Sequence, residues 1–305
     1  MTKKGPTIRD FQARFPDEDT CLNHLMRTRY GERLACFQCQ KGATYYRVKG
    51  RRSFVCEHCG YQVYPMAGTP FESTRTPLRD WFYVMFLFSA SRNGVAAKEV
   101  QRQLGVTYKT AWRMCRLIRE YMGYVDGDFP LGGPGKTVEV DETFIGGRDL
   151  DGTPDDKAVV FGVVERNGDV LTRHILNRGA GNLIPNIVKW VKPGSKINTD
   201  DWKGYRSLTE RYGFDHQTVN HSEKEYVRGD VHTNTIEAFW ANVKRGIKGT
   251  YVHVSKKHLQ TYLREFEYRH NLRRTPYLMF ELLLYGFSKV VLDRSSPSKG
   301  GRSVA

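Results

Sequence analysis

Four of the six cysteines form two matched pairs near the N-terminus, with the spacing C-x2-C-x16-C-x2-C. They are Cys36, Cys39, Cys56 and Cys59. Each C-x2-C turn directs two sulfur atoms to one centre, and two such turns complete the tetrahedron of a four-thiolate zinc site. The segment between the pairs alternates in polarity and turns at Lys49-Gly50, which predicts a β-hairpin. The pattern therefore predicts a zinc ribbon that holds one structural Zn²⁺.

Either cysteine pair alone would also fit a redox-active dithiol, but two matched pairs favour the metal site. The remaining cysteines, Cys21 and Cys115, are expected to pack as small apolar side chains. Basic residues crowd the hairpin and favour contact with a nucleic-acid backbone, while a solvated hairpin tip is the alternative. These residues are Arg47, Lys49, Arg51 and Arg52.

The positive charge of the chain is concentrated in its N-terminal part. The formal net charge is +15, and residues 1–125 hold 21 basic and 10 acidic side chains, a balance of +11. Such a segment predicts a polyanionic partner, most often nucleic acid; a basic surface that serves solubility is the alternative. No run approaches the roughly 20 apolar residues that span a bilayer, and no signal-peptide pattern opens the chain. We therefore expect a cytoplasmic, nucleoid-associated protein without a membrane partner.

Residues 93–122 have the outline of a helix-turn-helix. A short apolar-periodic segment stops at Gly105, and a second helix is expected to begin near Thr107. In helix-turn-helix proteins the exposed start of the second helix contacts DNA. Here that start carries Tyr108, Lys109, Trp112 and Arg113. An ordinary helical hairpin is the alternative, and the adjacent zinc ribbon and basic charge favour DNA binding.

The stretch KTVEVDETFIGG, residues 136–147, alternates apolar and polar side chains with the period of a β-strand. Its polar positions include Glu139 and Asp141, and Glu142 follows directly. Crowded carboxylates are tolerated if they share a proton or bind a cation. Oxygen ligands with few other donors suit Mg²⁺, which retains waters and binds substrate phosphates.

The segments after this strand predict a mixed sheet. Two strands, a helix and a fourth strand are expected at residues 157–166, 170–176, 181–191 and from 196. The first three strands would form an antiparallel meander, and the helical crossover would return the fourth parallel to one of them. If the fourth lies beside the first, Asp200 approaches Asp141. Pro185 is expected in the first turn of the helix, where a proline is tolerated.

Residues 232–251, HTNTIEAFWANVKRGIKGTY, have the apolar stripe of an amphipathic helix. Glu237 and Lys244 are seven residues apart, or two turns, and so project from the same side. Glu237 is a candidate third acid. The alternative is a capping box, in which Asn234 caps the helix and Glu237 bonds back to it.

Three blocks, VEVDETFIGG, TDDWKGY and HTNTIEAFWANVKRGIKGTYVHVS, resemble the catalytic blocks of DDE transposases of bacterial insertion sequences. The branch that the chain resembles carries an N-terminal zinc ribbon and a helix-turn-helix. The resemblance implies an RNase H-like catalytic domain. By motif, it implies an acidic triad and a basic companion at Asp141, Asp200, Glu237 and Lys244.

The resemblance leaves two positions with more than one candidate. Asp201 is an alternative to Asp200 as the second acid. Because some relatives use a non-acidic third residue, Asn234 and His232 are secondary candidates for the third position. The implied cofactors are two Mg²⁺ or Mn²⁺ ions at the acids.

The implied function is that of a transposase, which binds the terminal inverted repeats of an insertion sequence and joins them to target DNA. Since both ends of an element must be brought together, a homo-oligomer of at least two chains is expected. A non-catalytic DNA-binding protein that retains the fold is the alternative, and a nuclease that cuts without joining is a third possibility.

The expected fold class is α/β, with an RNase H-like mixed-sheet catalytic domain preceded by a small zinc ribbon and a helical helix-turn-helix unit. The expected boundaries are 1–70 for the N-terminal segment and zinc ribbon, 71–124 for the helix-turn-helix unit, 125–136 for a linker, 137–290 for the catalytic domain and 291–305 for a disordered tail.

Overall fold

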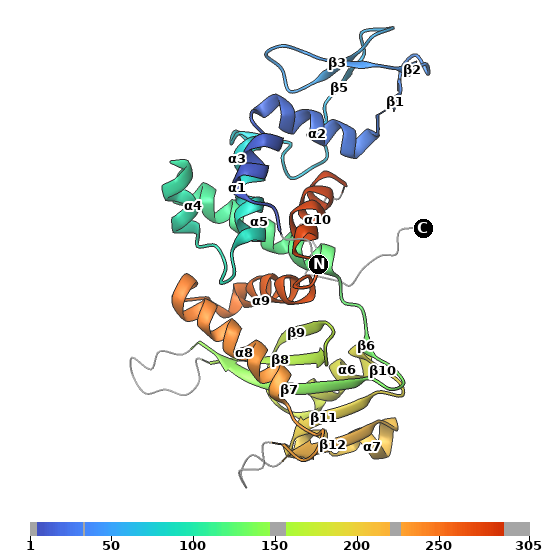
Figure 1. Ribbon diagram of the computed structural model, residues 1–305, viewed down its shortest axis with the longest axis vertical. Helices are drawn as coiled ribbons and strands as arrows, with labels where there is room; N and C mark the ends of the chain where they lie inside the picture. The colour runs from blue at the N-terminus through green and yellow to red at the C-terminus, as the bar shows by residue number, and fades with distance from the viewer. Residues whose placement is uncertain (1–4, 33, 147–156, 220–226, 290–305) are drawn as a thin grey trace. The chain divides into compact units, whose positions relative to one another are not determined.

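The chain divides into two compact units (Figure 1). The computed structural model describes residues 5–32, 34–146, 157–219 and 227–289. Within these, the first unit comprises the residues up to Ser91, Ala97–Val125 and the segment from Thr275, and the second comprises Arg92–Ala96 and Asp126–Arg274. The tail expected at 291–305 lies outside the described residues. None of the described helices combines the length and the apolar character needed to cross a membrane.

The zinc ribbon of the first unit consists of two small antiparallel sheets. One pairs β1 (Leu34–Ala35) with β2 (Gly42–Ala43), and the other orders β3 (Tyr45–Arg47), β4 (Phe54–Cys56) and β5 (Gln62–Val63). The predicted hairpin is confirmed as β3 and β4, and Gly50 in its turn has a φ of 75°, which favours glycine. The sequence-based expectation lacks β5, which is only two residues long.

The other regular elements described in the first unit are helices. They are α1 (Ile8–Arg14), α2 (Glu18–Tyr30), α3 (Leu78–Ala90), α4 (Ala97–Leu104), α5 (Tyr108–Asp126) and α10 (Pro276–Lys289). The two helices expected between residues 93 and 122 are confirmed, because α4 ends before Gly105 and α5 begins after Thr107. The φ of Gly105 is 65°, so glycine is the residue that ends the first helix without strain.

The last helix, α10, joins the first unit through aromatic side chains. Phe280 is fully buried, and its ring centroid lies 6.1 Å from those of both Phe11 and Phe15. The sequence-based boundary placed residues up to 290 in the catalytic domain, and the structure differs, because the chain from Thr275 packs in the first unit. Periodicity shows that a helix has an apolar side, but not which core receives that side.

The second unit is built on a five-stranded mixed sheet with the order β12-β11-β7-β8-β9. The strands are β7 (Thr137–Ile145), β8 (Ala158–Glu165), β9 (Val170–Ile175), β11 (Lys196–Asp200) and β12 (Asp215–Val219). The strands β7, β8 and β9 form an antiparallel meander, and β11 runs parallel to both β7 and β12. The predicted meander and the parallel return of the fourth strand are confirmed, and the strand beside which it returns is β7.

Helices cover both faces of this sheet. The helix α6 (Ala180–Trp190) shares one core with Val138 and Val140 of β7, and α8 (Asn234–Gly246) and α9 (Lys256–Asn271) share the other core with Ile145. Glu139 and Asp141 alternate with the two valines and therefore point to the α8 side. Shorter elements are η2 (Lys203–Tyr205) and α7 (Ser207–Tyr212) before β12, and the π-helical turn η4 (Ile247–Tyr251) after α8.

Two sequence-based expectations differ from the structure. Residues 125–136 are not a structureless linker, because β6 (Leu131–Gly132) pairs in parallel with β10 (Val191–Lys192). Two-residue strands leave no periodic pattern in the sequence. Pro185 is the sixth residue of α6 and lies beyond its first turn. A proline there removes a helical hydrogen bond, and burial of the apolar side of α6 offsets that loss.

Candidate zinc centre and acidic site

The four sulfur atoms of the zinc ribbon converge on one point. The Sγ atoms of Cys36 and Cys59 are 3.5 Å apart, those of Cys39 and Cys56 are 4.0 Å apart, and all four lie within 4.8 Å of one another. Tetrahedral Zn–S bonds of about 2.3 Å require sulfur separations of about 3.8 Å, so the set fits a structural Zn²⁺. Among the residues that the structure describes, no other group of three or more Cys, His, Asp or Glu ligand atoms comes this close together.

The basic residues of the ribbon hairpin fall into two groups. Arg47 and Arg52 are half-buried and tie the ribbon to α2: the Arg47 guanidinium lies 2.9 Å from Asp19, and that of Arg52 lies 3.1 Å from Glu18. Lys49 and Arg51 are exposed at the turn. Lys49 and Arg51 are therefore better placed to contact a polyanion, because neither makes an ion pair with an acid in the part of the chain that the structure describes.

The first turns of α5 present the residues that the sequence singled out. Tyr108, Lys109 and Arg113 are exposed, whereas Trp112 is half-buried, with the Arg116 guanidinium 5.8 Å from its ring. The predicted apolar side of α5 is confirmed by four fully buried side chains. They are Ala111, Met114, Cys115 and Ile118.

Asp141 and Asp200 lie on neighbouring parallel strands. The ladder of β11 and β7 pairs Lys196 with Thr137 and Asn198 with Glu139, and Asp200 and Asp141 each lie two residues beyond the last of these pairs. Burial raises the pKa of Asp141 to about 7, with further contributions from the negative charges of Glu142, Asp200 and Glu237. The carboxylates are therefore close enough to repel one another, as the sequence predicts.

Each of the three predicted acids has one oxygen that accepts a hydrogen bond from a nearby donor. The pairs are Trp240 Nε1 to Asp141 Oδ2 (3.0 Å), Trp202 N to Asp200 Oδ1 (3.2 Å) and Thr233 Oγ1 to Glu237 Oε1 (2.8 Å). Donors of this kind orient carboxylates in metal sites. The ligand atoms of Asp141, Asp200 and Glu237 do not all lie within 4.8 Å of one another.

Space for the Trp240 indole is provided by Gly162, the residue of β8 paired with Asp141. A Cβ at Gly162 would lie 2.5 Å from Cζ2 of Trp240 and 3.1 Å from Ile236. Any larger residue would therefore displace the indole that orients Asp141. Trp240 lies on the apolar stripe of α8 and is 3% exposed. The hydrogen bond to Asp141 is a second role that the apolar stripe of the helix does not reveal.

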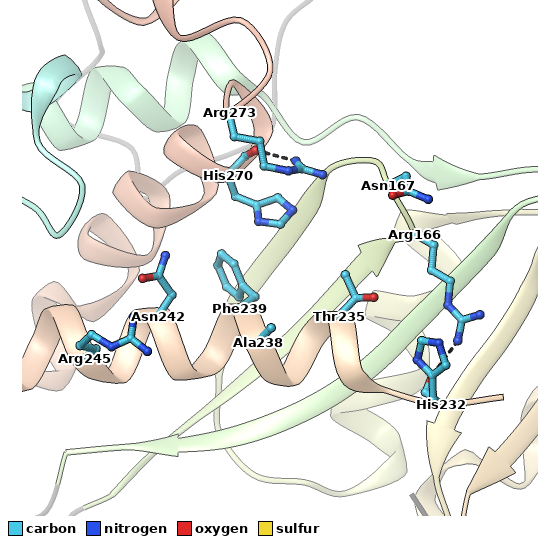
Figure 2. Close-up of a pocket in the computed structure, with 10 residues that line it drawn as sticks. All are labelled: Arg166, Asn167, His232, Thr235, Ala238, Phe239, Asn242, Arg245, His270 and Arg273. Atoms are coloured by element: carbon cyan, nitrogen blue, oxygen red, sulfur yellow. Dashed lines mark hydrogen bonds between the residues drawn. The ribbon is translucent and has the colours of Figure 1, made fainter. Parts of the chain in front are cut away.

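Helix α8 has two exposed sides with different character. Glu237 and Lys244 are both exposed and lie two turns apart, about 10 Å along the helix. The flank that includes Thr235 and Asn242 lines a separate groove (Figure 2). The site of the acids therefore occupies only one side of α8.

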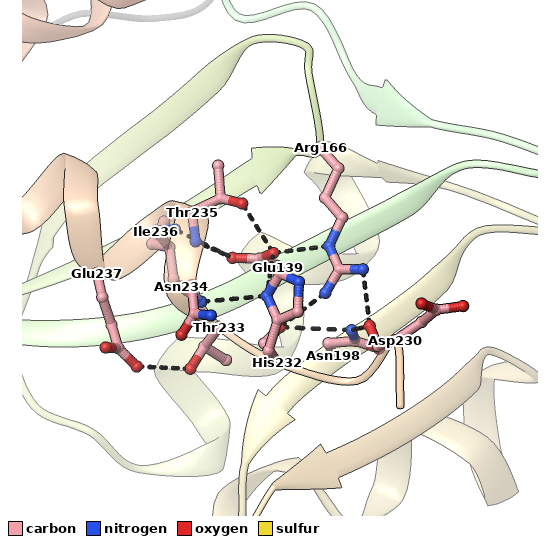
Figure 3. A network of polar contacts seen from close by, with 10 residues as sticks. All are labelled: Glu139, Arg166, Asn198, Asp230, His232, Thr233, Asn234, Thr235, Ile236 and Glu237. Carbon is pink, nitrogen blue, oxygen red and sulfur yellow. Dashed lines mark hydrogen bonds and ion pairs between the residues drawn. The ribbon is translucent and has the colours of Figure 1, made fainter. Parts of the chain in front are cut away.

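Glu139 caps α8 from a distant part of the chain (Figure 3). Its carboxylate is fully buried and accepts hydrogen bonds from the backbone N–H groups of Thr235 (2.8 Å) and Ile236 (3.1 Å). Arg166 donates to it at 2.7 Å and also binds the backbone carbonyls of Asp230 and His232. An anion at a helix N-terminus satisfies unpaired N–H groups and complements the helix dipole.

This arrangement shows that the capping box considered for Asn234 and Glu237 is wrong. The N-cap of α8 is Thr233, whose hydroxyl bonds to the Glu237 side chain, and Asn234 is the exposed first helical residue. The Nδ1 atom of His232 lies 3.2 Å from the carboxylate of Glu139, the group that caps α8. Glu139 was visible in the sequence as a polar residue two positions before Asp141, on the same side of the strand.

Glu142 lies on the opposite side of β7 and is buried. The hydroxyl of Tyr205 donates to its carboxylate, and Arg178 lies 3.7 Å away. Burial raises the pKa of Glu142, and the negative charge of Asp200 adds to the shift. The Glu142 side chain is therefore shielded from solvent, whereas that of Asp201 is exposed.

Sequence comparison relates these features to known proteins. Residues 130–271 match an ISXO2-like transposase domain, and residues 16–62 match a transposase zinc-ribbon domain. An uncharacterized protein in the transposable element ISH50 of Halobacterium salinarum is 28% identical over 288 residues, which cover 86% of this chain and 94% of that protein. An uncharacterized transposase-like protein of Haemophilus influenzae is 32% identical over 102 residues, 33% of this chain and 80% of that protein. No solved structure is significantly similar.

The first of these matches includes the strands of the acidic site and α8, and the second includes all four cysteines. The class to which the chain belongs is that of the transposases. Within it, the chain belongs to the family that carries an ISXO2-like transposase domain, here behind a transposase zinc ribbon.

Loss of zinc should unfold the ribbon before the rest of the chain, because so small a unit depends on the metal for its folding free energy. Cys36→Ser should bind much less than one Zn²⁺ per chain and become sensitive to protease between residues 34 and 63. Bound zinc and limited proteolysis measure this. Cys115→Ala, outside the ribbon, is the control and should retain zinc. Full zinc occupancy with an intact ribbon in Cys36→Ser would contradict the assignment.

Glu139→Gln should destabilise the second unit by about 3 kcal/mol, because it leaves the half-buried Arg166 without its ion pair and puts an amide N–H₂ against helical donors. Urea unfolding measures the loss, and hydrogen exchange should show weaker protection at Thr235 and Ile236. Glu210→Gln on the exposed side of α7 is the control and should change stability by less than about 0.5 kcal/mol. Equal losses of stability in Glu139→Gln and Glu210→Gln would contradict the role of Glu139 as the cap of α8.

Asp141 should make stability depend on pH in the direction opposite to an ion-paired acid. Its pKa is raised to about 7 in the folded chain, so the folded state binds the proton more tightly and stability falls as pH rises from about 4 to 7. In magnesium-free buffer at pH 8, Asp141→Asn should be more stable than the unsubstituted chain, by on the order of 2 kcal/mol.

The difference between Asp141→Asn and the unsubstituted chain should shrink at pH 5, where the carboxyl is mostly protonated in the folded state. Asparagine retains an oxygen for the Trp240 bond, so the comparison isolates the charge. Unfolding curves at the two pH values test this, with Asp201→Asn as the exposed control. If the difference in unfolding free energy between Asp141→Asn and the unsubstituted chain did not change with pH, the neighbouring negative charges would not be acting on Asp141.

Proposed function

We propose that the chain is a DDE-type DNA transposase that binds the ends of an insertion sequence and catalyses metal-dependent strand cleavage and strand transfer. The second unit is proposed to be the RNase H-like catalytic domain. Asp141, Asp200 and Glu237 would hold two Mg²⁺ or Mn²⁺ ions, and Lys244 would bind a phosphate of the DNA.

The observation that carries this proposal is the crowding of acids at Asp141. Its pKa of about 7 reflects burial and three negative neighbours, and its side chain accepts a hydrogen bond from the Trp240 indole. A buried carboxylate surrounded by like charges is expensive unless a cation neutralises it. Carboxylate oxygens are the ligands that Mg²⁺ prefers, so the donor set fits the ion.

The sheet supports the same proposal. Strand β7 lies in the centre, with β11 parallel to it on one side and β8 antiparallel on the other. Ligand sites in mixed sheets of this kind lie at the carboxyl ends of parallel strands, and Asp200 is the last residue of β11. The helix that bears Glu237 is fixed to β7 by Glu139.

The residues of the chain would supply positioning and charge. Trp240, Trp202 and Thr233 orient one oxygen of each acid. Lys244, about 10 Å along α8 from Glu237, would hold a phosphate that neighbours the reacting one. Phosphoryl transfer is mostly positioning and electrostatics, so few other groups are required. Bound Mg²⁺ would promote attack by a water or a 3′-hydroxyl and neutralise the leaving oxygen.

The first unit would bind the terminal inverted repeats. The charge balance of +11 in residues 1–125 supports this, together with the exposed basic side chains at the ribbon turn and on α5. These are Lys49, Arg51, Lys109 and Arg113. Trp112 and Tyr108 would contact base edges or sugars beside them. Because two element ends must meet, the active form would contain at least two chains.

Asp141→Asn, Asp200→Asn and Glu237→Gln should each abolish cleavage and joining and leave DNA binding nearly unchanged, because an amide keeps the shape but not the charge that binds Mg²⁺. The three acids act as a unit, so each change alone should cost nearly as much as all three. A strand-transfer assay with pre-cleaved element ends and Mg²⁺ measures this. Lys244→Ala should slow the reaction less.

The control is Asp201→Asn, which removes an exposed charge next to Asp200 and should be milder. Glu142→Gln is not a suitable control, because its carboxylate is buried against Tyr205. If Glu237→Gln kept full strand transfer, the third ligand would have to be sought at Asn234 or His232. If the unsubstituted chain showed neither cleavage nor joining, and the variants did not differ from it, the non-catalytic DNA-binding protein would be the better description.

A further inference from the structure

A groove of about 540 Å³ runs along the flank of α8 that bears Ala238, Asn242 and Arg245 (Figure 2). Its walls are α8, the C-terminal end of α9 and the turn between β8 and β9. Nothing in the proposed chemistry uses it. The ten side chains that line it include three arginines and two histidines but no aspartate or glutamate.

The three arginines are Arg166, Arg245 and Arg273, and they are held in different ways. Arg166 is ion-paired with Glu139 beneath the groove. Arg273 donates to the backbone carbonyls of His270 (2.6 Å) and Gly168 (2.8 Å), which fix the direction of its guanidinium, and the negative charge of Asp169 acts on it. Arg245 is exposed and makes no hydrogen bond or ion pair with any residue that the structure describes. The groove therefore has an uncompensated positive charge.

Neutral polar groups and a small apolar floor complete the lining. Asn242 and Thr235 present an amide and a hydroxyl, and Phe239 and Ala238 lie between them (Figure 2). Toward α9, the Nε2 atom of His270 is buried and has no hydrogen-bond partner among the described residues. Guanidinium, amide and hydroxyl donors above an apolar floor match a DNA backbone, in which charged phosphate oxygens alternate with the C–H faces of deoxyribose.

Helix geometry separates this groove from the acidic site. At 100° per residue, Lys244 returns to within about 20° of Glu237, whereas Arg245 and Asn242 lie about 80° and 140° around the axis. The helix is about 10 Å thick with its side chains, so the groove and the side that bears Glu237 lie on adjacent sides of α8. A duplex with a phosphate at the acids would therefore extend another part of its backbone toward the groove.

We propose that this groove binds a phosphodiester backbone of DNA at a place distinct from the reacting phosphate, with Arg245 as its principal contact. The inference rests on the proposed function only for the identity of the polyanion. Two sources carry the same chemistry, the element end itself and the target duplex. The groove would hold DNA across α8 and so help to direct the reacting strand to the acids.

Arg245→Glu tests the groove in the full-length chain that also carries Asp141→Asn, so that binding is measured without chemistry. Affinity for an element-end duplex is measured first, and affinity for an unrelated target duplex is measured with the element end saturating, each over a series of salt concentrations. We expect Arg245→Glu to weaken one of these about tenfold and to reduce the salt slope by about 1, as loss of a phosphate contact does.

The charge-matched control is Arg211→Glu on the exposed end of α7, which should change either affinity less than twofold. Asn242→Asp is a second variant that adds a negative charge to the groove and keeps the side-chain shape, and it should weaken binding in the same arm. Thermal unfolding checks that both variants fold. Loss in the first arm identifies the element end as the ligand, and loss in the second identifies the target.

Equal affinities for Arg245→Glu, Asn242→Asp and the Arg211→Glu control in both arms would overturn the proposal. So would a loss that leaves the salt slope unchanged, since a phosphate contact must release counterions. Failure of the proposed function is a separate result. It would appear as an absence of cleavage by the unsubstituted chain with Mg²⁺. The comparison of DNA affinities between Arg245→Glu and Arg211→Glu would still test whether the groove binds a phosphodiester backbone.

Discussion

The hydrogen bonds between Glu139 and the first turn of α8 are the interaction on which the acidic site depends. Glu139 and Asp141 are two residues apart on β7, so one strand supplies both the anchor of the helix and one of the acids. Glu237 lies in the same first turn and is positioned by that anchor. The ion pair with Arg166 offsets the cost of burying the Glu139 charge, and Arg166 also fixes the segment that leads into α8.

The acidic site itself works against the stability of the fold. Asp141 is crowded by negative neighbours, and the only hydrogen-bond donor described for its Oδ2 atom is the Trp240 indole. The unfavourable free energy of this crowding is offset by the apolar core on the other side of β7, where Val138 and Val140 are fully buried against α6. Proteins commonly store such unfavourable arrangements at sites of chemistry and offset them elsewhere. Gly162 belongs to the same arrangement, because it reserves the space that Trp240 needs.

Local patterns in the sequence were sufficient for much of the fold and for part of the site. The cysteine spacing predicts the ribbon, and the alternation around Asp141 together with the crossover predicts a mixed sheet in which the fourth strand runs parallel to one of the first three. Those features depend on neighbours in sequence or on topology rules. The role of Glu139 depends on donors 96 and 97 residues away, which no periodicity encodes. Likewise, the apolar side of α10 could have joined either unit, and only the packed structure shows which.

The position of α10 has a consequence for how the protein is made. Its residues are synthesised after the whole of the second unit, yet Phe280 packs into the aromatic cluster that contains Phe11 and Phe15 in the first unit. Domains generally fold in the order of their synthesis, but the first unit cannot finish folding until the second unit has been translated. A chain cut short by premature termination would therefore lack a complete N-terminal unit, and such fragments would compete poorly with intact protein for its binding sites.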